Sequence, residues 1–290
     1  MATASKNQHR NARARIAAQR AAAARRQRRR KLITAVSSAV AVVAIVVALV
    51  AVKTFGAPAK ASVTPAQSLP GVARSITTVP ASTLAAVGTG TAAALEPVRG
   101  KPPALTEDGK PEVLFMSAEY CPYCAAQRWA LTVALSRFGT FSGLHFIHSS
   151  STDVFPSTPT LSFYHSRYTS KYLAFTPVEW YNQAGKPLQN PTAAQRALFT
   201  TYDAPPYVSQ ANSLGLPFLD IGNREILTGA QFLPTAMHGM TWTQVAAAMR
   251  DPHSAVAKDI LGAANVITAS LCQLTGAHPA GVCTASGATS

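Results

Sequence analysis

The sequence has 290 residues, 48% of them hydrophobic, which is enough to bury the core of one or two domains. Its formal net charge of +14 is typical of a nucleic-acid-binding protein, but eleven of the 26 Lys and Arg residues lie in residues 1–31, which contain no acidic residue. The other fifteen are nearly balanced by twelve acidic residues in 53–290, which excludes a strongly basic folded surface.

An apolar segment follows the basic tail. Residues 32–52 run for twenty-one residues without a charge, and about twenty residues of helix cross a bilayer core. We therefore expect one N-terminal transmembrane helix in the cell membrane. The alternative is a cleavable signal peptide, but its apolar region is usually about 7 to 15 residues long, and Ala57-Pro58-Ala59 is a poor cleavage site.

The basic cluster at residues 25–31 (RRQRRRK) predicts the orientation of that helix. Positive charge beside a first transmembrane segment favours the cytoplasmic side, so residues 1–31 form a cytoplasmic tail and the C-terminal bulk is extracytoplasmic. The cluster also suits the anionic headgroups of a lipid bilayer. Nucleic acid is not needed to explain the tail, and we expect no nucleic-acid partner.

Residues 53–95 are rich in Ala, Thr, Ser, Val, Gly and Pro and show no sustained periodicity. This composition is typical of a flexible stalk, although a short helix near residues 81–95 is compatible with it. We expect the folded domain to occupy residues 96–290.

The folded domain begins with a strand, a helix and a second strand. The apolar run 112–117 (EVLFMS) predicts a buried strand, and the stretch from Pro122 to Phe138 predicts a helix that stops at Gly139. Residues 143–149 (GLHFIHS) predict the second strand. Together these elements indicate a parallel crossover unit and an α/β fold.

The rest of the chain alternates strands and helices. Residues 158–178 predict two strands joined by a turn, and residues 192–202 and 208–213 predict helices. Residues 216–227 contain two short strands around a Gly-Asn turn, which indicates a hairpin. The C-terminal part predicts helices at 241–249 and 254–274.

Cys121 and Cys124 carry the chemistry that this pattern predicts. A thiolate attacks a disulfide sulfur and a second thiol within reach expels it, so two cysteines separated by two residues form a redox unit. A strand ending at Tyr120 and a helix starting near Pro122 place Cys121 at a helix N-terminus, where a thiolate is stabilised. Cys121 is then the nucleophile and Cys124 the resolving thiol.

The alternatives for this pair are half of a zinc site or a structural bridge. Zinc requires further ligands, and Cys272 and Cys283 are not a second pair of this spacing, although a site made from all four cysteines stays open. We predict no metal and no cofactor. Cys272 and Cys283 are expected to form a structural disulfide worth about 3 kcal/mol, and a second redox relay is the alternative.

The loop Ser117-Ala118-Glu119-Tyr120-Cys121-Pro122-Tyr123-Cys124 resembles the active-site loop of the thioredoxin superfamily. Its Ala-Glu-aromatic-Cys approach is similar to thioredoxins, and its Pro122-Tyr123 dipeptide to glutaredoxins. The region from Pro111 to Cys283 also resembles a prokaryotic family of membrane-anchored thioredoxin-like proteins catalogued as a domain of unknown function. The segments that carry this resemblance are SAEYCPYCAAQRW, SSSTDVFPSTPTLSFY, YTSKYLAF and AANVITASLC…GVC.

This resemblance implies a thioredoxin-like fold with a helical and hairpin insertion. It also implies a cis-proline opposite the cysteines. Leu216-Pro217-Phe218, followed by the Gly-Asn turn, fits that position, which makes residues 150–212 the insertion; Pro159 in Thr158-Pro159-Thr160 is the alternative. Thioredoxins place a buried acid where this sequence has Phe115, and we expect the nearby Glu119 to face solvent.

These observations predict a membrane-anchored, extracytoplasmic thiol–disulfide oxidoreductase acting on exported proteins. Its partners would be exported protein thiols or disulfides and a membrane or extracytoplasmic redox partner. Two other hypotheses are a docking module without turnover and copper handling by the same cysteine pair. The sequence does not decide between oxidation and reduction of the substrate.

Overall fold

The computed structural model describes residues 66–285. The predicted cytoplasmic tail and transmembrane helix, residues 1–31 and 32–52, lie outside the described residues, as does the first part of the predicted stalk. Every described residue belongs to one compact unit, Lys60–Ser290.

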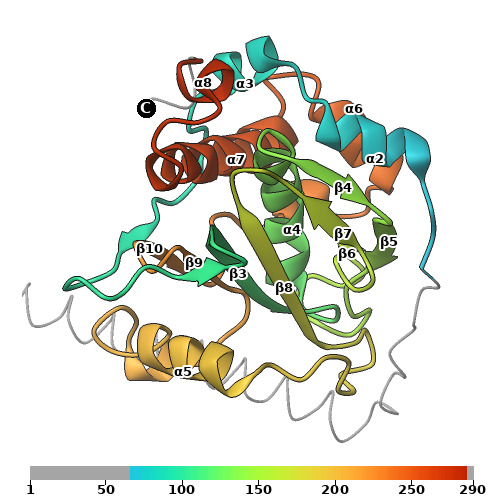
Figure 1. Cartoon of the computed structure of the whole chain (residues 1–290). Helices are drawn as coiled ribbons and strands as arrows, with labels where there is room; N and C mark the ends of the chain where they lie inside the picture. The colour runs from blue at the N-terminus through green and yellow to red at the C-terminus, as the bar shows by residue number, and fades with distance from the viewer. Residues whose placement is uncertain (1–65, 286–290) are drawn as a thin grey trace, which may run out of the picture. The chain divides into compact units, whose positions relative to one another are not determined.

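The described part of the chain is a mixed α/β structure (Figure 1). Its strands are β1 (Glu96–Pro97), β2 (Thr106–Glu107), β3 (Lys110–Ala118), β4 (Thr140–Ser142), β5 (His145–His148), β6 (Pro159–Ser162), β7 (Arg167–Thr169), β8 (Ala174–Tyr181), β9 (Phe218–Ile221) and β10 (Glu225–Thr228). Its α-helices are α2 (Pro70–Thr77), α3 (Ala81–Val87), α4 (Pro122–Ser136), α5 (Ala193–Tyr202), α6 (Trp242–Ala248), α7 (Ala255–Leu274) and α8 (Ala280–Cys283). Two short 3-10 helices are η1 (Gln210–Asn212) and η2 (Pro234–Met237).

Strand β3 is the centre of the main sheet. It pairs with β8 in parallel from Glu112 to Ala118 and with β9 in antiparallel orientation from Val113 to Met116. Strand β10 lies beside β9, and β1 beside β10, while β2 pairs with the start of β3. The sequence therefore places the cysteine pair directly after the central strand.

Side chains of β3 alternate between the two faces of the sheet. Val113 and Phe115 belong to the larger core cluster, which includes residues of α4 and α7, whereas Leu114 and Met116 pack with Phe199 of α5 and neighbouring strands. Figure 1 shows α5 on the opposite side of the sheet from α4 and α7. A strand buried on both faces explains why its sequence is a continuous apolar run.

Several sequence predictions are confirmed. The predicted first strand, the helix after the cysteines and the hairpin around the Gly-Asn turn correspond to β3, α4 and the β9–β10 pair. The helices predicted at 192–202, 241–249 and 254–274 are α5, α6 and α7. The helix predicted at 208–213 is only the three-residue η1.

The predicted crossover partner is wrong. We expected β5 to be the parallel neighbour of β3, but β5 pairs with β6 in antiparallel orientation, and β8 is the parallel strand. The β5–β6 hairpin packs on α4 instead, because the Trp129 indole donates to the Pro159 carbonyl at 2.9 Å and the Thr160 hydroxyl donates to the Ala125 carbonyl at 2.9 Å. Strands β6 and β8, predicted as joined neighbours, are in different sheets, and β7 lies between them along the chain.

The predicted insertion at residues 150–212 is also wrong as a unit, because it contains β8 of the main sheet. The segment inserted between α4 and β8 carries the two small pairs β4–β7 and β5–β6. A second segment, with α5, connects β8 to β9.

The stalk prediction is wrong for residues 66–95. Val72 and Ile76 of α2 and Leu84 of α3 are buried in the main core. The Asn265 amide of α7 donates hydrogen bonds to the carbonyls of Leu84 and Gly88 at 2.8 and 2.7 Å. Gly262 of α7 lies against the backbone of Thr89 and Gly90, just after α3. A composition typical of a linker here forms two core helices, of which α3 is the short helix that the composition allowed near residues 81–95, and folded structure begins by residue 66 rather than 96.

Within residues 66–285, α7 is the one helix with the length and hydropathy to cross a membrane. Its most apolar window is 72% buried inside the fold, beneath α3 and beside α4. This is the pattern of a core helix.

Candidate functional site

Cys121 and Cys124 lie where the central strand ends and α4 begins. Cys121 is the N-cap residue of α4, with extended backbone, and Pro122 follows at the first position of the helix. The backbone N–H of Cys124 donates to the Cys121 sulfur at 3.2 Å. The cap role that Ser or Asp usually fills is therefore taken by a thiol. The two cysteines are not bonded to each other.

The two thiols have opposite electrostatic environments. The hydrogen bond with the Cys124 side chain lowers the pKa of Cys121 most; burial opposes this, and backbone N–H groups and Arg128 lower it further, leaving it below that of an ordinary cysteine. Burial raises the pKa of Cys124 well above the ordinary value, the Cys121 sulfur raises it further, and Arg128 lowers it in part. Cys121 is thus the stronger thiolate former of the two.

Exposure follows the same order. Cys121 retains 6% of its accessible surface and Cys124 none. Of the two cysteines, only Cys121 therefore has surface that a molecule in solution can contact, which is compatible with its predicted role as the nucleophile.

Leu216 and Pro217 lie against the pair from the loop before β9. The Cys121 thiol donates to the Leu216 carbonyl at 3.5 Å, and the Leu216–Pro217 peptide bond is cis. The Asp203 carboxylate accepts the Gly215 N–H at 2.5 Å and holds this loop at the end of α5. Pro159, the alternative, begins β6 and contacts Trp129 through its carbonyl.

Aromatic side chains surround the cysteines. Tyr120, Tyr123 and Tyr181 pack around the pair together with Leu216. The Tyr120 and Tyr181 rings lie 6.2 Å apart, and Tyr123 meets Phe155 edge-on at 5.8 Å. The predicted loop residues Tyr120, Pro122 and Tyr123 therefore form part of the wall around the thiols.

A cleft of about 520 Å³ opens beside Tyr120. One wall is the loop from Ser150 to Val154, tied to the site by the Ser150 N–H, which donates to the Tyr120 carbonyl at 2.8 Å. The other wall is Tyr181 and the turn that follows β8. Val154 is 70% exposed at the rim, so the cleft offers apolar and aromatic surface next to Cys121.

A buried ion pair that was not predicted from the sequence lies behind the cysteines. Arg128 of α4 donates through Nε and Nη2 to the two carboxylate oxygens of Glu179 on β8, at 2.9 and 2.6 Å. The Ser117 hydroxyl donates to the same carboxylate at 2.6 Å, and the Phe163 N–H at 3.1 Å. Arg128 and Glu179 are both fully buried. The signal available in the sequence was a single Arg inside an otherwise apolar helix, four residues after Cys124.

Glu119 corrects one prediction. We expected it to face solvent, but it is buried and accepts a hydrogen bond from the Ser162 hydroxyl at 2.7 Å. Burial raises the pKa of Glu119, and the hydrogen bond with Ser162 and the charge of Arg128 oppose that rise. Ser162 belongs to β6, and the β5–β6 pair that covers Glu119 was not predicted, because its two strands were assigned to other partners.

Phe115 is fully buried and meets Phe163 edge-on at 6.0 Å. Position 115 of β3 therefore supplies no carboxylate to the site. The buried acid behind the pair, Glu179, comes instead from the neighbouring strand, at the residue paired in register with Ser117.

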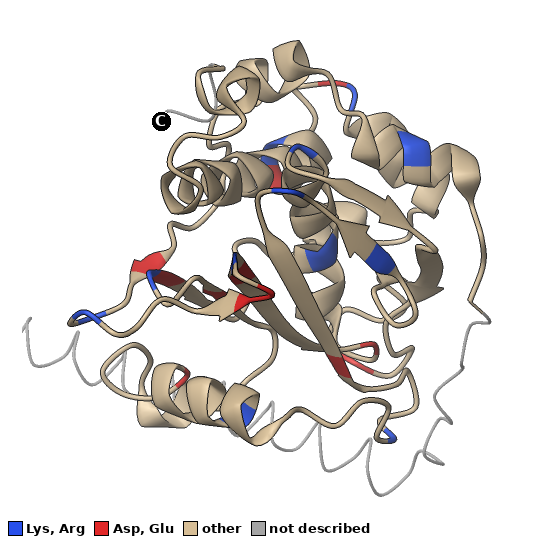
Figure 2. Ribbon diagram, in the orientation of Figure 1, with Lys and Arg blue, Asp and Glu red and all other residues tan. Residues whose placement is uncertain are grey.

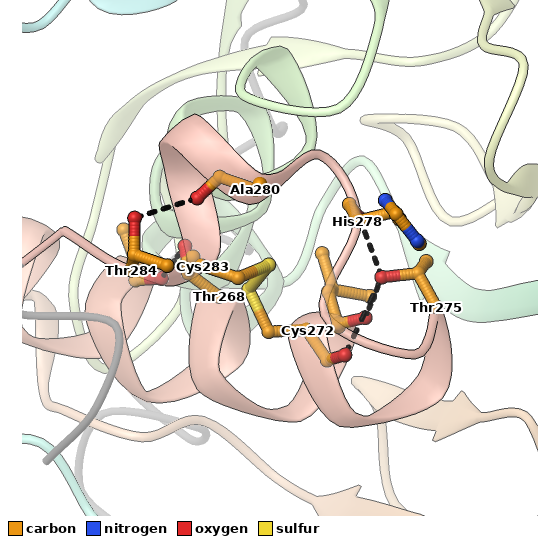
Figure 3. Close-up of a disulfide and its surroundings, with 9 residues drawn as sticks. Thr268, Cys272, Thr275, His278, Ala280, Cys283 and Thr284 are labelled. Carbon is orange, nitrogen blue, oxygen red and sulfur yellow. Dashed lines mark hydrogen bonds between the residues drawn. A yellow bond between two sulfur atoms is a disulfide. The ribbon is translucent and has the colours of Figure 1, made fainter.

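Cys272 and Cys283 form a disulfide that links the end of α7 to α8, with Cα atoms 5.5 Å apart (Figure 3). The Thr275 hydroxyl, between them, donates to the His278 carbonyl at 2.6 Å and closes the same turn. Because these cysteines bind each other, the alternative of one zinc site made from all four is wrong. Residues 66–285 also contain no group of three or more Cys, His, Asp or Glu placed to hold a metal ion.

Charged residues are scattered over the described ribbon and do not gather into one patch (Figure 2). Near the cysteines, Asp153 is the one charged residue among those that line the cleft. The immediate surroundings of the cleft are therefore aromatic and weakly acidic.

A family model described as "Domain of unknown function (DUF929)" matches residues 96–273. The match covers the cysteine pair, the Arg128–Glu179 pair and Pro217, and it ends one residue beyond Cys272. No curated protein and no solved structure matches the chain significantly.

Proposed function

Because the chain belongs to the DUF929 family, a domain of unknown function, we propose its activity from the site itself: a thiol–disulfide oxidoreductase acting through Cys121 and Cys124. The observation that carries the proposal is the position of Cys121 at the N-cap of α4. There it accepts the Cys124 N–H at 3.2 Å, and its pKa is lowered by the neighbouring Cys124 hydrogen bond, while Cys124 is fully buried behind it.

The reaction has two steps. The Cys121 thiolate attacks one sulfur of a substrate disulfide, forms a mixed disulfide and releases the other substrate sulfur as a thiolate. Cys124 then attacks Cys121, which forms the Cys121–Cys124 disulfide and releases the second substrate thiol. The same steps in reverse oxidise a substrate dithiol. The atoms and the two electrons balance between protein and substrate, so no cofactor is needed.

Backbone beside the thiols suits a polypeptide substrate. The Leu216 carbonyl faces the Cys121 sulfur at 3.5 Å, directly before Pro217. Backbone groups next to a nucleophile can pair with a substrate strand. The cleft lined by Tyr120 and Tyr181 gives room for substrate side chains.

The topology supports a thioredoxin-like core. In the strand order β8-β3-β9-β10, β8 is parallel to β3, β9 is antiparallel to β3, and β10 is antiparallel to β9. The cysteines lie between β3 and α4, and Pro217 lies just before β9. These are the features that the sequence resemblance implies. The β4–β7 and β5–β6 pairs then form the insertion, between α4 and β8.

We place the activity outside the cell membrane. The apolar residues 32–52 and the basic residues 25–31 support a single-pass anchor with a cytoplasmic N-terminus. The Cys272–Cys283 disulfide fits an oxidising compartment. The substrates would then be thiols or disulfides of exported proteins, and a membrane or extracytoplasmic redox partner would regenerate the pair.

The test compares three forms of the full chain in detergent micelles: wild type, Cys124→Ala and Cys121→Ala. Each is mixed with a peptide that contains one disulfide. We expect wild type to exchange thiols with the peptide, Cys124→Ala to stop at a 1:1 adduct that dithiothreitol releases, and Cys121→Ala to do neither. The Cys272→Ser/Cys283→Ser variant is the matched control and should still exchange.

The proposal is overturned if wild type exchanges no faster than Cys121→Ala and Cys124→Ala forms no adduct. A docking module without turnover would give that result. Copper retained in a 1:1 ratio after purification, and lost in Cys121→Ala, would favour metal handling instead.

A further inference from the structure

Arg128 occupies an unusual position behind the resolving thiol. It lies four residues after Cys124 in α4, so both are on the same face of the helix, one turn apart. Long helical side chains lean toward the N-terminus of their helix, and this brings the guanidinium back toward the cysteines. Arg128 is fully buried.

The hydrogen bonding of Arg128 is incomplete. Nε and Nη2 are fixed by Glu179, whereas Nη1 is buried and has no hydrogen-bond partner among the described residues. A buried, charged N–H group without a partner costs free energy, because water no longer solvates it. The Glu179 carboxylate occupies one edge of the guanidinium and leaves the other edge free.

We propose that Arg128, held by Glu179, stabilises the negative charge that develops on Cys124 when it resolves the mixed disulfide. Arg128 is then a positioning residue, which acts on the second step of exchange through its positive charge. This inference rests on the proposed thiol–disulfide activity. A purely structural role for the Arg128–Glu179 pair would leave the buried Nη1 of Arg128 unexplained, because that group has no hydrogen-bond partner among the described residues.

The Cys124 thiol loses its proton and its sulfur attacks Cys121, forming the Cys121–Cys124 bond while the bond from Cys121 to the substrate sulfur breaks. The substrate sulfur leaves as a thiolate and takes up the proton. Cys124 is oxidised and the substrate sulfur is reduced, and the charge on Cys124 exists only between these events.

The charges around Cys124 agree with this role. Burial raises the pKa of Cys124 and its neighbour Cys121 raises it further, while the charge of Arg128 lowers it. Arg128 also lowers the pKa of Cys121. The other ionisable groups near the pair are three tyrosines and two carboxylates: Tyr120, Tyr123 and Tyr181, Glu119 just after β3, and Glu179 on β8. Arg128 is the cation that acts on both sulfurs.

Two variants of the pair have opposite expected effects. Arg128→Met/Glu179→Gln removes both charges and keeps the volumes, and such replacements of buried pairs are often tolerated. Glu179→Gln alone keeps the cation and removes its counter-charge. The first variant should raise the pKa of Cys124, and the second should lower it.

The measurement is the rate at which Cys124 resolves a Cys121–glutathione mixed disulfide, followed from pH 5 to pH 10 in the full chain. Each unit of rise in pKa lowers the thiolate fraction tenfold below the midpoint, while nucleophilicity rises about threefold, so the rate falls about threefold. Because the pKa of Cys124 is raised well above that of an ordinary cysteine, most of this range lies below its midpoint, and there we expect Arg128→Met/Glu179→Gln to be slower than wild type. Glu179→Gln should shift the profile to lower pH and should therefore be faster than wild type over the same range.

Arg137→Met is the matched control. Arg137 lies at the far end of the same helix and is also partly buried, with an unpartnered Nη1. Removing it should leave the profile of wild type unchanged.

The inference is overturned if wild type resolves the adduct and both Glu179→Gln and the double variant resolve it at the wild-type rate at every pH. It is also overturned if both variants are slower than wild type at every pH, since damage to the fold alone would do that. Failure of the proposed function looks different, because wild type itself would then not resolve the adduct.

Discussion

Asp220 is a buried acid in the main sheet, and its protonation should make the stability of the fold depend on pH. It lies in β9, fully buried, where one carboxylate oxygen accepts the Asn223 N–H at 2.7 Å and the other has no partner among residues 66–285. Burial raises the pKa of Asp220 from 3.8 to about 7; the Asn223 hydrogen bond opposes this, and Glu112 on β3 adds to it. The neutral carboxyl is therefore the form that the fold prefers.

The sign of the pH dependence follows from that shift. Between about pH 4 and pH 7 the folded chain holds a proton on Asp220 that the unfolded chain has lost, so stability falls as the pH rises. The stabilisation is fully present below pH 4 and lost above pH 7. A shift of about three units at 1.36 kcal/mol each corresponds to about 4 kcal/mol.

Asp220→Asn should remove this slope, because an amide has nearly the shape of a neutral carboxyl and keeps an oxygen for the Asn223 N–H. The assay is urea unfolding of wild type and variant at a series of pH values from 4 to 8, with fluorescence of the tryptophans as the probe. The difference between the two curves cancels the contributions of carboxyls that do not interact with Asp220, and it includes the effect of Glu112 on Asp220. An unchanged difference in unfolding free energy across this range would refute the reasoning.

Three further outcomes are expected. At pH 7 iodoacetamide should modify Cys121 at least tenfold faster than Cys124, as peptide mass spectrometry would show, because a lowered pKa and partial exposure favour the first thiol; equal rates would contradict the assigned roles. Cys272→Ser/Cys283→Ser should lower the unfolding free energy by about 3 kcal/mol without stopping exchange, since the disulfide closes a short loop of sequence separation 11; loss of exchange at full stability would instead indicate a relay. Asp203→Ala should cost about 1.5–3 kcal/mol, the usual value of a hydrogen bond to a charged group, and should slow exchange, because the freed loop is the one beside the cysteine pair; exchange at the wild-type rate would contradict that role.

The local elements were predictable from sequence because their patterns are strong. The apolar run of β3, the helix after Pro122 and the Gly-Asn hairpin each contain the residues that begin and end them. They correspond to β3, α4 and the β9–β10 pair. Cys121 at the strand–helix junction follows from those elements alone. Short-range rules are sufficient wherever one contiguous segment decides the outcome.

Pairing between distant segments was not predictable in the same way. Strands β5 and β8 both follow α4, and both are short apolar segments, so nothing local indicates which of them pairs with β3. The choice depends on Trp129 and the Thr160 hydroxyl, which tie the β5–β6 hairpin to α4 and leave β8 for the sheet. Likewise, the Ala-rich segment around α3 becomes a core helix only because α7 offers a closely fitting surface.

Glu119, Arg128 and Glu179 show the same limit at the site. Each is a single charged residue in an apolar or mixed segment. Whether it is buried and paired depends on contacts between segments that are far apart in the sequence, such as those of Ser117 and Arg128 with Glu179. Glu119 is covered by the β5–β6 hairpin, so its burial depended on the strand assignment that the sequence did not give correctly. A buried charge is predictable only after its partner strand has been placed.

Within the proposed activity, the charges around Cys121 favour one direction of exchange. Everything that lowers the pKa of Cys121, namely the hydrogen bond from Cys124, the backbone N–H groups of α4 and Arg128, stabilises the reduced form of the pair and leaves the disulfide without that benefit. A pair whose reduced form is stabilised gives up its disulfide readily and acts as an oxidant. Phe115 supplies no carboxylate, and the charge of Glu179, the buried acid behind the pair, is balanced by Arg128. The proposal therefore favours disulfide formation in exported proteins over disulfide reduction.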